Sequence, residues 1–373
     1  LFGLKNMGRF LKIHWVFYCM LIFAVSRIIM IYQFDLANDI IAHQQHHDFF
    51  AAMCKWDCQW YLTIINDGYD LHPRTTPKLW HGLANWAFFP LYPYIVKLLV
   101  SLTGGSAVVI GIVLNQIIVL FALIVFYLYL KLFVDELNSR FGVVLLAFSP
   151  FSVYFSSLYT EALFLLLSLL AFYFMRTNRL ILSALCGGFL SATRPIGVMF
   201  SLPFLAHQLR HSKLTSAGAI KIIILTIISI SGLIMFMTYL QLHAGDFLAF
   251  QHIQKGWGRH GLDTQNLTKQ ISQMVGDTHN FLFFSLSFLV SVYLLIKKHF
   301  AEALFNLLCI LPGVMTGTMM SEGRFCGTLF TLYFGIVIIA RKSNSLKLSI
   351  ALIFILFYTS YFLYWMAHAS FLI

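Results

Sequence analysis

The chain has 373 residues, of which 60% are hydrophobic and only 10% are charged, and its mean hydropathy is +0.81. A soluble domain of this size would not have this composition, so we expect an all-α, polytopic membrane protein. The excess of 25 Lys and Arg over 14 Asp and Glu does not indicate a nucleic-acid partner, because most of the basic residues lie at the ends of apolar runs, where they orient a membrane protein.

The first expected membrane span is the apolar run from about 13 to 34, which follows a basic N-terminal stretch. This run is longer than the core of a signal peptide, so we expect it to be retained. A long polar segment comes next, and we expect residues 35–105 to form a first outer loop with juxtamembrane helices. A second outer loop is expected at 244–280.

The first outer loop contains a carboxylate, Asp57, between Trp56 and Trp60. At helical spacing Asp57 and Tyr61 share one side, and Gly68 stands where a left-handed residue would end the helix. The pattern predicts an amphipathic helix that lies on the bilayer surface and presents an acid. The alternative is an interfacial anchor in which the aromatic rings sit among the headgroups and the acid is merely solvated.

The segment that follows is interrupted by Pro90 and Pro93 and carries Lys97, so we expect it to lie beside the membrane rather than cross it. The later apolar runs predict about eleven spans in total, some of them tilted or broken because they are shorter than about 20 residues. These runs lie at about 106–133, 141–157, 159–176, 180–193, 195–211, 217–243, 281–297, 301–320, 326–340 and 346–366.

The distribution of basic residues supports a cytoplasmic N-terminus and an outer C-terminus. In this topology 15 of the 25 Lys and Arg fall in short inner loops, whereas most acids fall in the outer loops. The inner basic residues are Lys5, Arg9, Lys12, Lys131, Arg140, Arg176, Arg179, Arg210, Lys213, Lys221, Lys297, Lys298, Arg341, Lys342 and Lys347. If the segment 88–103 crossed the membrane, every later loop would invert and the positive-inside rule would be violated.

The same topology places four charged residues, Asp57, Glu161, Arg194 and Arg324, on the outer side. The last three each lie between two apolar runs, and charges at membrane depth are costly and usually functional. We therefore expect them to face a shared cavity at the outer leaflet. Each one taken singly is also compatible with an interfacial salt bridge or a helix cap.

A set of motifs between about 45 and 335 resembles the PIG-V family, the GPI mannosyltransferase II group, including its shorter bacterial members. The motifs are Trp56-Asp57 with Tyr61 and Gly68-Tyr69, Phe88-Phe89-Pro90-Leu91-Tyr92-Pro93, Ser149-Pro150, Tyr159-Thr160-Glu161, Thr193-Arg194-Pro195, Gly245-Asp246 with Phe250, Trp257-Gly258-Arg259, and Arg324-Phe325.

The resemblance implies a single GT-C glycosyltransferase domain over residues 1–373, which takes a hexose, in this family mannose, from a polyprenyl-phosphate donor. It implies a lipid-, glycan- or protein-linked acceptor. We expect no cofactor. The chain length is nearer that of the bacterial members, which implies a bacterial inner membrane and a periplasmic site; a eukaryotic member would work in the ER lumen.

The residues suit inverting transfer in a single step. Asp57 would act as the general base, and Arg324 and Arg194 would stabilise the leaving phosphate. Further residues would contribute to substrate binding: the sugar and acceptor pockets would be shaped by Trp56, Tyr61, Trp86 and Tyr92. Glu161 would orient a side chain or a sugar hydroxyl, and Trp257 and Arg259 would also contact the substrate. A secondary transporter and a lipid scramblase remain alternatives, although no internal repeat is evident.

Two clusters raise the question of a metal. His43, His47 and Asp48 have a suitable spacing, but nothing else completes a tetrahedral set, so a solvated loop is the preferred interpretation. Cys54 and Cys58 would point the same way on a helix and would suit a metal or a strained bridge. No second pair accompanies them, and we expect no metal site.

Overall fold

A computed structural model describes residues 2–41, 48–76, 81–211, 215–263 and 266–368. All regular secondary structure in these ranges is helical, so the chain is an all-α polytopic membrane protein, as the composition predicted. The histidines of the His43 to Asp48 cluster lie outside the described residues. Asp48 itself caps the short helix that follows, where its carboxylate accepts hydrogen bonds from the backbone N–H groups of Phe50 and Ala51.

Long helices alternate with short ones along the chain. In order they are α1 (Phe2–Ile41), α2 (Phe49–Ala52), α3 (Asp57–Asn66), η2 (Asn85–Ala87), α4 (Leu91–Thr103), α5 (Ala107–Leu130), α6 (Glu136–Ala147), α7 (Ser152–Ser156), α8 (Glu161–Arg176), α9 (Leu180–Ser191), η3 (Pro195–Phe200), α10 (Ser201–His211), α11 (Ser216–Ala244), α12 (Ala249–His252), η4 (Ile253–Trp257), α13 (Leu267–Gly276), α14 (Thr278–Ile296), α15 (Phe300–Met315), α16 (Glu322–Gly327), α17 (Phe330–Ala340) and α18 (Asn344–Met366).

Five of the described helices are long and apolar enough to cross a membrane: most of α1, together with α5, α11, α14 and α18. Another four, α4, α9, α15 and α17, are apolar but have only 10–17 residues. Helix α4 has 13 residues and is about 20 Å long, which is less than the hydrocarbon core of about 30 Å. Its length agrees with a juxtamembrane position, and the total of about eleven spans stays a prediction.

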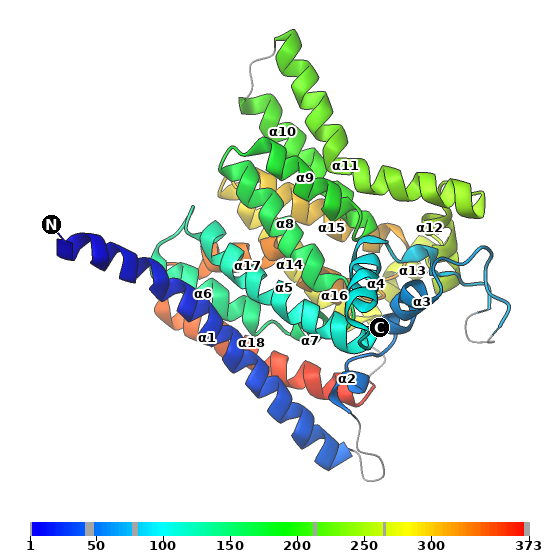
Figure 1. The fold of residues 1–373 in the computed structure, drawn as a ribbon, viewed down its shortest axis with the longest axis horizontal. Helices are drawn as coiled ribbons and strands as arrows, with labels where there is room; N and C mark the ends of the chain where they lie inside the picture. Colours follow the sequence, from blue (N-terminus) through cyan, green and yellow to red (C-terminus); the bar gives the residue numbers. More distant parts are fainter. Residues whose placement is uncertain (1, 42–47, 77–80, 212–214, 264–265, 369–373) are drawn as a thin grey trace.

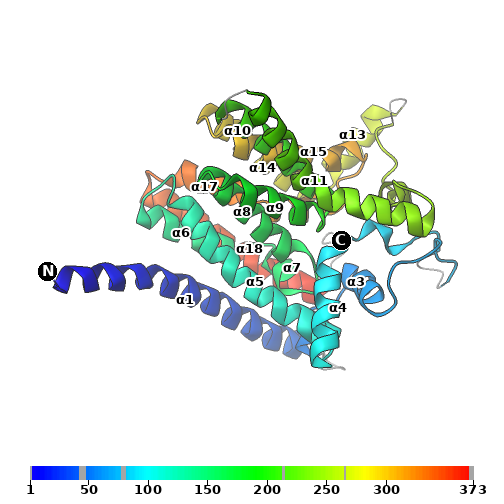
Figure 2. The ribbon, with the colours of Figure 1, turned by 45° about the horizontal axis from the view of Figure 1, so that its top comes forward.

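The long helices pack as neighbours from one side of the molecule to the other (Figure 1). Helix α1 packs on α18, α5 and α6; α5 packs on α8, α8 on α9, and α9 on α11. The short helices α3, α4, α12 and α13 gather at one end of this assembly, in both views (Figures 1 and 2). This end carries Asp57 and the other charged residues of the predicted site.

A buried ion pair joins α8 and α15. Arg176, at the last turn of α8, donates from Nε to Glu302 Oε1 at 3.0 Å and from Nη2 to Glu302 Oε2 at 2.6 Å, and Glu302 is fully buried. Two parallel N–H···O bonds hold the guanidinium and the carboxylate in one plane and fix how α8 lies against α15.

Helix α3 differs from the surface helix that the sequence predicted. It is packed against α4, α5 and η2, and it buries Cys58, Trp60, Tyr61, Ile64 and Ile65. The reason is that the aromatic residues Trp60 and Tyr61 pack against other side chains of the protein, such as Phe88, rather than lying among lipid headgroups. Gly68 takes a positive φ of 88° just after the helix, as expected of a left-handed residue at that end.

Candidate active site

A strained and cross-linked turn delivers Asp57 to the site. Trp56 has φ +46°, which is unfavourable for a bulky residue, and Asp57 starts α3 immediately after it. A disulfide between Cys54 and Cys58 closes the turn, so these cysteines form a bridge and not a metal site. The Tyr159 hydroxyl donates to the Lys55 carbonyl at 2.8 Å and accepts from the Asp57 N–H at 3.1 Å. The turn is therefore held on both sides of Trp56.

Asp57 enters an ion-pair network with residues from three distant parts of the chain. Arg324 Nη1, from α16, donates to Asp57 Oδ2 at 2.8 Å, and its Nε lies 3.3 Å from Glu161 Oε1. Arg194, which precedes η3, lies 2.9 Å from the same Glu161 oxygen. The two acids and the two arginines are thus joined in one chain of charges.

Burial makes this network energetically significant. Glu161 is 1% exposed, and Arg194 and Arg324 are each 9% exposed. Burial alone would lower the pKa of Arg324, but the neighbouring Asp57 and Glu161 raise it above its usual value. Each member depends on its partner, because removing one would leave the other as a buried, unpaired charge.

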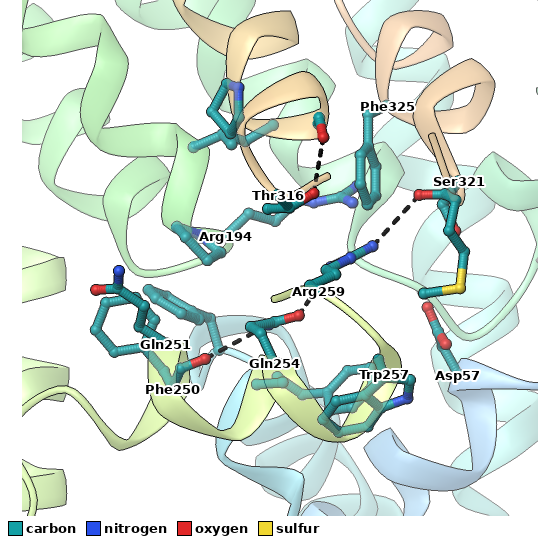
Figure 3. Close-up of a pocket in the computed structure, with 18 of the residues that line it drawn as sticks. Asp57, Arg194, Phe250, Gln251, Gln254, Trp257, Arg259, Thr316, Ser321 and Phe325 are labelled. Carbon is teal, nitrogen blue, oxygen red and sulfur yellow. Dashed lines mark hydrogen bonds between the residues drawn. The ribbon is translucent and has the colours of Figure 1, made fainter. Parts of the chain in front are cut away.

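The network borders a cavity of about 380 Å³ (Figure 3). Charged and polar groups line part of its wall, and apolar side chains line the rest. The lining residues are Asp57, Tyr61, Ala87, Phe88, Phe89, Thr193, Arg194, Pro195, Ile196, Met199, Phe250, Gln251, Gln254, Trp257, Arg259, Cys309, Pro312, Gly313, Thr316, Met320, Ser321, Arg324 and Phe325.

Three arginines surround one aromatic ring in this wall. The guanidinium carbons of Arg194, Arg324 and Arg259 lie 4.7, 5.2 and 5.6 Å from the centre of the Phe325 ring. Attraction between the cations and the ring face holds the three side chains together in spite of their like charge. The result is a group of three guanidinium groups in the wall of the cavity, beside the Asp57 carboxylate.

A second aromatic group forms another part of the wall. Trp257 makes an edge contact with Phe88, with the ring centres 6.0 Å apart, and both residues line the cavity. Trp60 stacks on Phe88 from behind at 5.8 Å. Aromatic faces of this kind bind the C–H surface of a sugar ring or an apolar chain, so the cavity offers an anion-binding region next to an apolar one.

Comparison with protein families gives a match over residues 24–300 to the model described as Mannosyltransferase (PIG-V). This range holds Asp57, Glu161, Arg194 and Arg259. The chain belongs to the PIG-V mannosyltransferase family. It is therefore a membrane glycosyltransferase, and its reaction requires a sugar donor and an acceptor. No curated protein gives a significant match.

The cavity of this PIG-V family member brings six of the ten sequence-predicted site residues together. Those that line it are Asp57, Tyr61, Arg194, Trp257, Arg259 and Arg324. Glu161 lies behind the wall, where it pairs with both arginines. The position and partners of Glu161 are those of a residue that orients the arginines.

Three predicted aromatic residues do not line the cavity. Trp86 is buried and donates to the Asp70 carbonyl at 2.6 Å. Tyr92 is buried and donates to the Gly111 carbonyl at 3.0 Å, which ties α4 to α5. Trp56 packs against Trp365 with the ring centres 4.7 Å apart. All three pack behind the segments that position the site residues.

Several lining residues were not predicted from the sequence. Gln251 and Gln254 come from α12 and η4, in the expected second outer loop; Thr316 directly follows α15, and Ser321 directly precedes α16. Phe325 belongs to the Arg324-Phe325 motif, but the sequence did not predict that it lines the site. Its position next to Arg324 was the one available signal, because an aromatic ring beside a buried guanidinium indicates a cation–π contact.

Proposed function

We propose that this protein transfers mannose, with inversion, from a polyprenyl-phosphate donor to a lipid-, glycan- or protein-linked acceptor. The observation that carries the proposal is the 2.8 Å ion pair between Asp57 and Arg324 at the edge of a largely apolar cavity. It puts a carboxylate, which can accept the proton of an acceptor hydroxyl, next to a guanidinium, which can bind a phosphate. These are the two groups that such a transfer requires.

The proposed reaction has one step. The acceptor oxygen attacks the anomeric carbon as Asp57 takes the hydroxyl proton, and the bond between that carbon and the phosphate oxygen breaks. The electron pair of this bond leaves with the polyprenyl phosphate, whose charge changes from about −1 in the diester to about −2 in the monoester. Arg194 and Arg324 stabilise the phosphate as it leaves, and Glu161 orients both.

The remaining wall suits the two ends of such a donor. Trp257 and Tyr61 offer ring surfaces for the sugar, and Arg259 offers hydrogen bonds. Ile196, Met199 and other apolar residues form a surface that a prenyl chain can contact. We propose Trp86 and Tyr92 as supports that shape these pockets from behind, and Trp56 as the support of the turn before Asp57.

We propose that the site faces the outer side of the membrane, either the periplasm of a bacterial inner membrane or the ER lumen. The Cys54–Cys58 disulfide beside Asp57 supports this orientation. Disulfides form and persist in oxidising compartments, whereas the cytosol keeps thiols reduced. A dolichyl- or undecaprenyl-type donor would be presented from that leaflet.

The test is transfer of radiolabelled mannose from a polyprenyl-phosphate donor by detergent-purified protein, with candidate acceptors supplied in parallel. We expect Asp57→Asn to lower turnover about 10²-fold or more, because Asn cannot take the proton. Asp67→Asn is the matched control, because Asp67 follows α3 and does not line the cavity. Normal transfer by a folded Asp57→Asn protein would remove Asp57 from the role of base. Transport or scrambling without transfer would contradict the enzymatic proposal as a whole.

A further inference from the structure

The three arginines of the cavity differ in how their charges are offset. Arg324 pairs with Asp57 and Glu161, and Arg194 pairs with Glu161. Arg259 differs, because no carboxylate of a described residue lies within ion-pair distance of it. Counted over the described part of the chain, three guanidinium groups therefore face two carboxylates, and the cavity holds one positive charge in excess.

Arg259 is held in place by neutral groups. Its Nη1 donates to Gln254 Oε1 at 2.8 Å, and its Nη2 lies 3.4 Å from the Met320 carbonyl oxygen. In Figure 3 the side chain extends between Arg194 and Asp57. Burial lowers the pKa of Arg259 to about 10, so the group remains a cation at neutral pH.

The nearest additional acid does not offset this charge at neutral pH. Glu322 is fully buried behind Gly313, and burial raises the pKa of its carboxyl to about 8. At pH 7 most of these carboxyls are protonated and neutral. Arg259 is thus the group of this cavity that has an unused charge for an anion.

We propose that Arg259 is the resting ligand of the donor phosphate, and that proton transfer to Asp57 releases Arg324 to the leaving phosphate. The inference rests on the proposed function and specifies which cation acts at which stage. The donor is a phosphodiester with one negative charge, which matches the single positive charge in excess.

The second half of the proposal follows from charge conservation. When Asp57 accepts the acceptor proton it becomes neutral, and Arg324 loses the charge that had offset its own. In the same step the phosphate oxygen keeps the electrons of the broken bond, and the phosphate gains one negative charge. One cation becomes available as one anion forms, so the transfer separates no net charge within the cavity.

Binding measurements on the full-length, detergent-purified protein test both halves. The probes are farnesyl phosphate, a monoester that stands for the leaving group, and mannosyl farnesyl phosphodiester, which stands for the donor. At about pH 7 the monoester is mostly a dianion, because its second pKa is about 6. We expect Arg259→Gln to weaken the binding of both probes about 10- to 100-fold, since charge-assisted hydrogen bonds are lost.

Two matched variants separate this effect from a general loss of charge. Lys255→Gln removes an exposed cation of the same segment that does not line the cavity, and we expect affinities near those of the wild type. Arg259→Lys keeps the charge, and we expect it to bind the phosphodiester within a few-fold of the wild type.

Asp57→Asn tests the release of Arg324 independently of whether Arg259→Gln folds. Asn resembles protonated Asp57 in charge, so we expect this variant to bind the monoester about tenfold more tightly and the phosphodiester about equally. Equal binding of both probes by Arg259→Gln and Lys255→Gln, or no gain for the monoester in Asp57→Asn, would overturn the inference. Mannose transfer by Asp57→Asn would contradict the proposed base but not the phosphate-binding result, so the two failures are distinguishable.

Discussion

Tyr159 shows how one hydroxyl outside the cavity can control the reacting group. Its oxygen bonds to the backbone on both sides of Trp56, and its ring centre lies 5.5 Å from the Arg324 guanidinium carbon. Because the turn at Trp56 is strained, these two hydrogen bonds fix the direction in which Asp57 leaves the turn. Tyr159 is thus a positioning residue, and it acts through Asp57, the proposed base.

We expect Tyr159→Phe to lower kcat about tenfold and to leave KM for the donor almost unchanged, because a displaced base affects the transition state more than substrate binding. The measurement is steady-state mannose transfer together with the Tm in detergent. Tyr358→Phe is the control, since Tyr358 is also buried and donates to a backbone carbonyl, that of Ser26, away from the turn. Equal kcat losses in the two variants would assign Tyr159 a purely structural role.

For single residues, the sequence predicted which charged residues lie together better than it predicted which of them form pairs. Asp57 and Arg324 were both selected, yet they are 267 positions apart, and no local pattern specifies that they form an ion pair. The aromatic residues show the opposite problem. In the sequence, Trp86, Tyr92 and Tyr61 are all aromatic residues of the kind found at membrane interfaces. Only Tyr61 lines the cavity, because the packing of α3, η2 and α4 decides which ring faces the cavity.

At the scale of elements, the junction of α15 and α16 contains a buried acid. Glu322 opens α16, and its Oε2 has no hydrogen-bond partner among the described residues. Gly313 of α15 leaves room for it, since a Cβ there would lie only 1.8 Å from this oxygen. A glycine inside an apolar helix therefore makes space for a carboxyl next to the cavity wall, a relation that the spacing along the chain does not reveal.

The junction makes stability dependent on pH. Burial raises the pKa of Glu322 from 4.5 to about 8, so between these values the unfolded chain loses a proton that the folded chain keeps. Stability should fall as the pH rises through this window, by up to about 5 kcal/mol in total. Thermal unfolding in detergent at a series of pH values measures the effect. Glu322→Gln cannot ionise, and we expect its Tm to fall less; an equal fall in both proteins would show that other groups cause it.

For the whole molecule, the helices confirm the all-α membrane class that the sequence predicted, whereas the juxtamembrane position of α4 and the path through the membrane stay predictions. Several apolar runs, such as the one that holds α17, give helices of only about 11 residues. Hydropathy alone does not show whether such a short helix crosses the membrane. An adjacent helix or loop that is packed in the protein can provide the remaining length of the span. The charge pattern gives a definite expectation instead: the end with Asp57 is outside, and the opposite end of α5 is inside.

This orientation is testable with α5, whose 24 residues reach about 36 Å and can cross the bilayer. Its N-terminal half lies near the site, because Asn115 donates to the Tyr159 carbonyl at 2.9 Å. We expect His260→Cys, an exposed position in the loop beside the cavity, to react with a membrane-impermeant maleimide on intact cells. Leu132→Cys, just beyond the other end of α5 and 44% exposed, should react only after permeabilisation. The unmodified chain is the control for its own cysteines. The reverse pattern would place the site on the cytoplasmic side and would contradict this orientation.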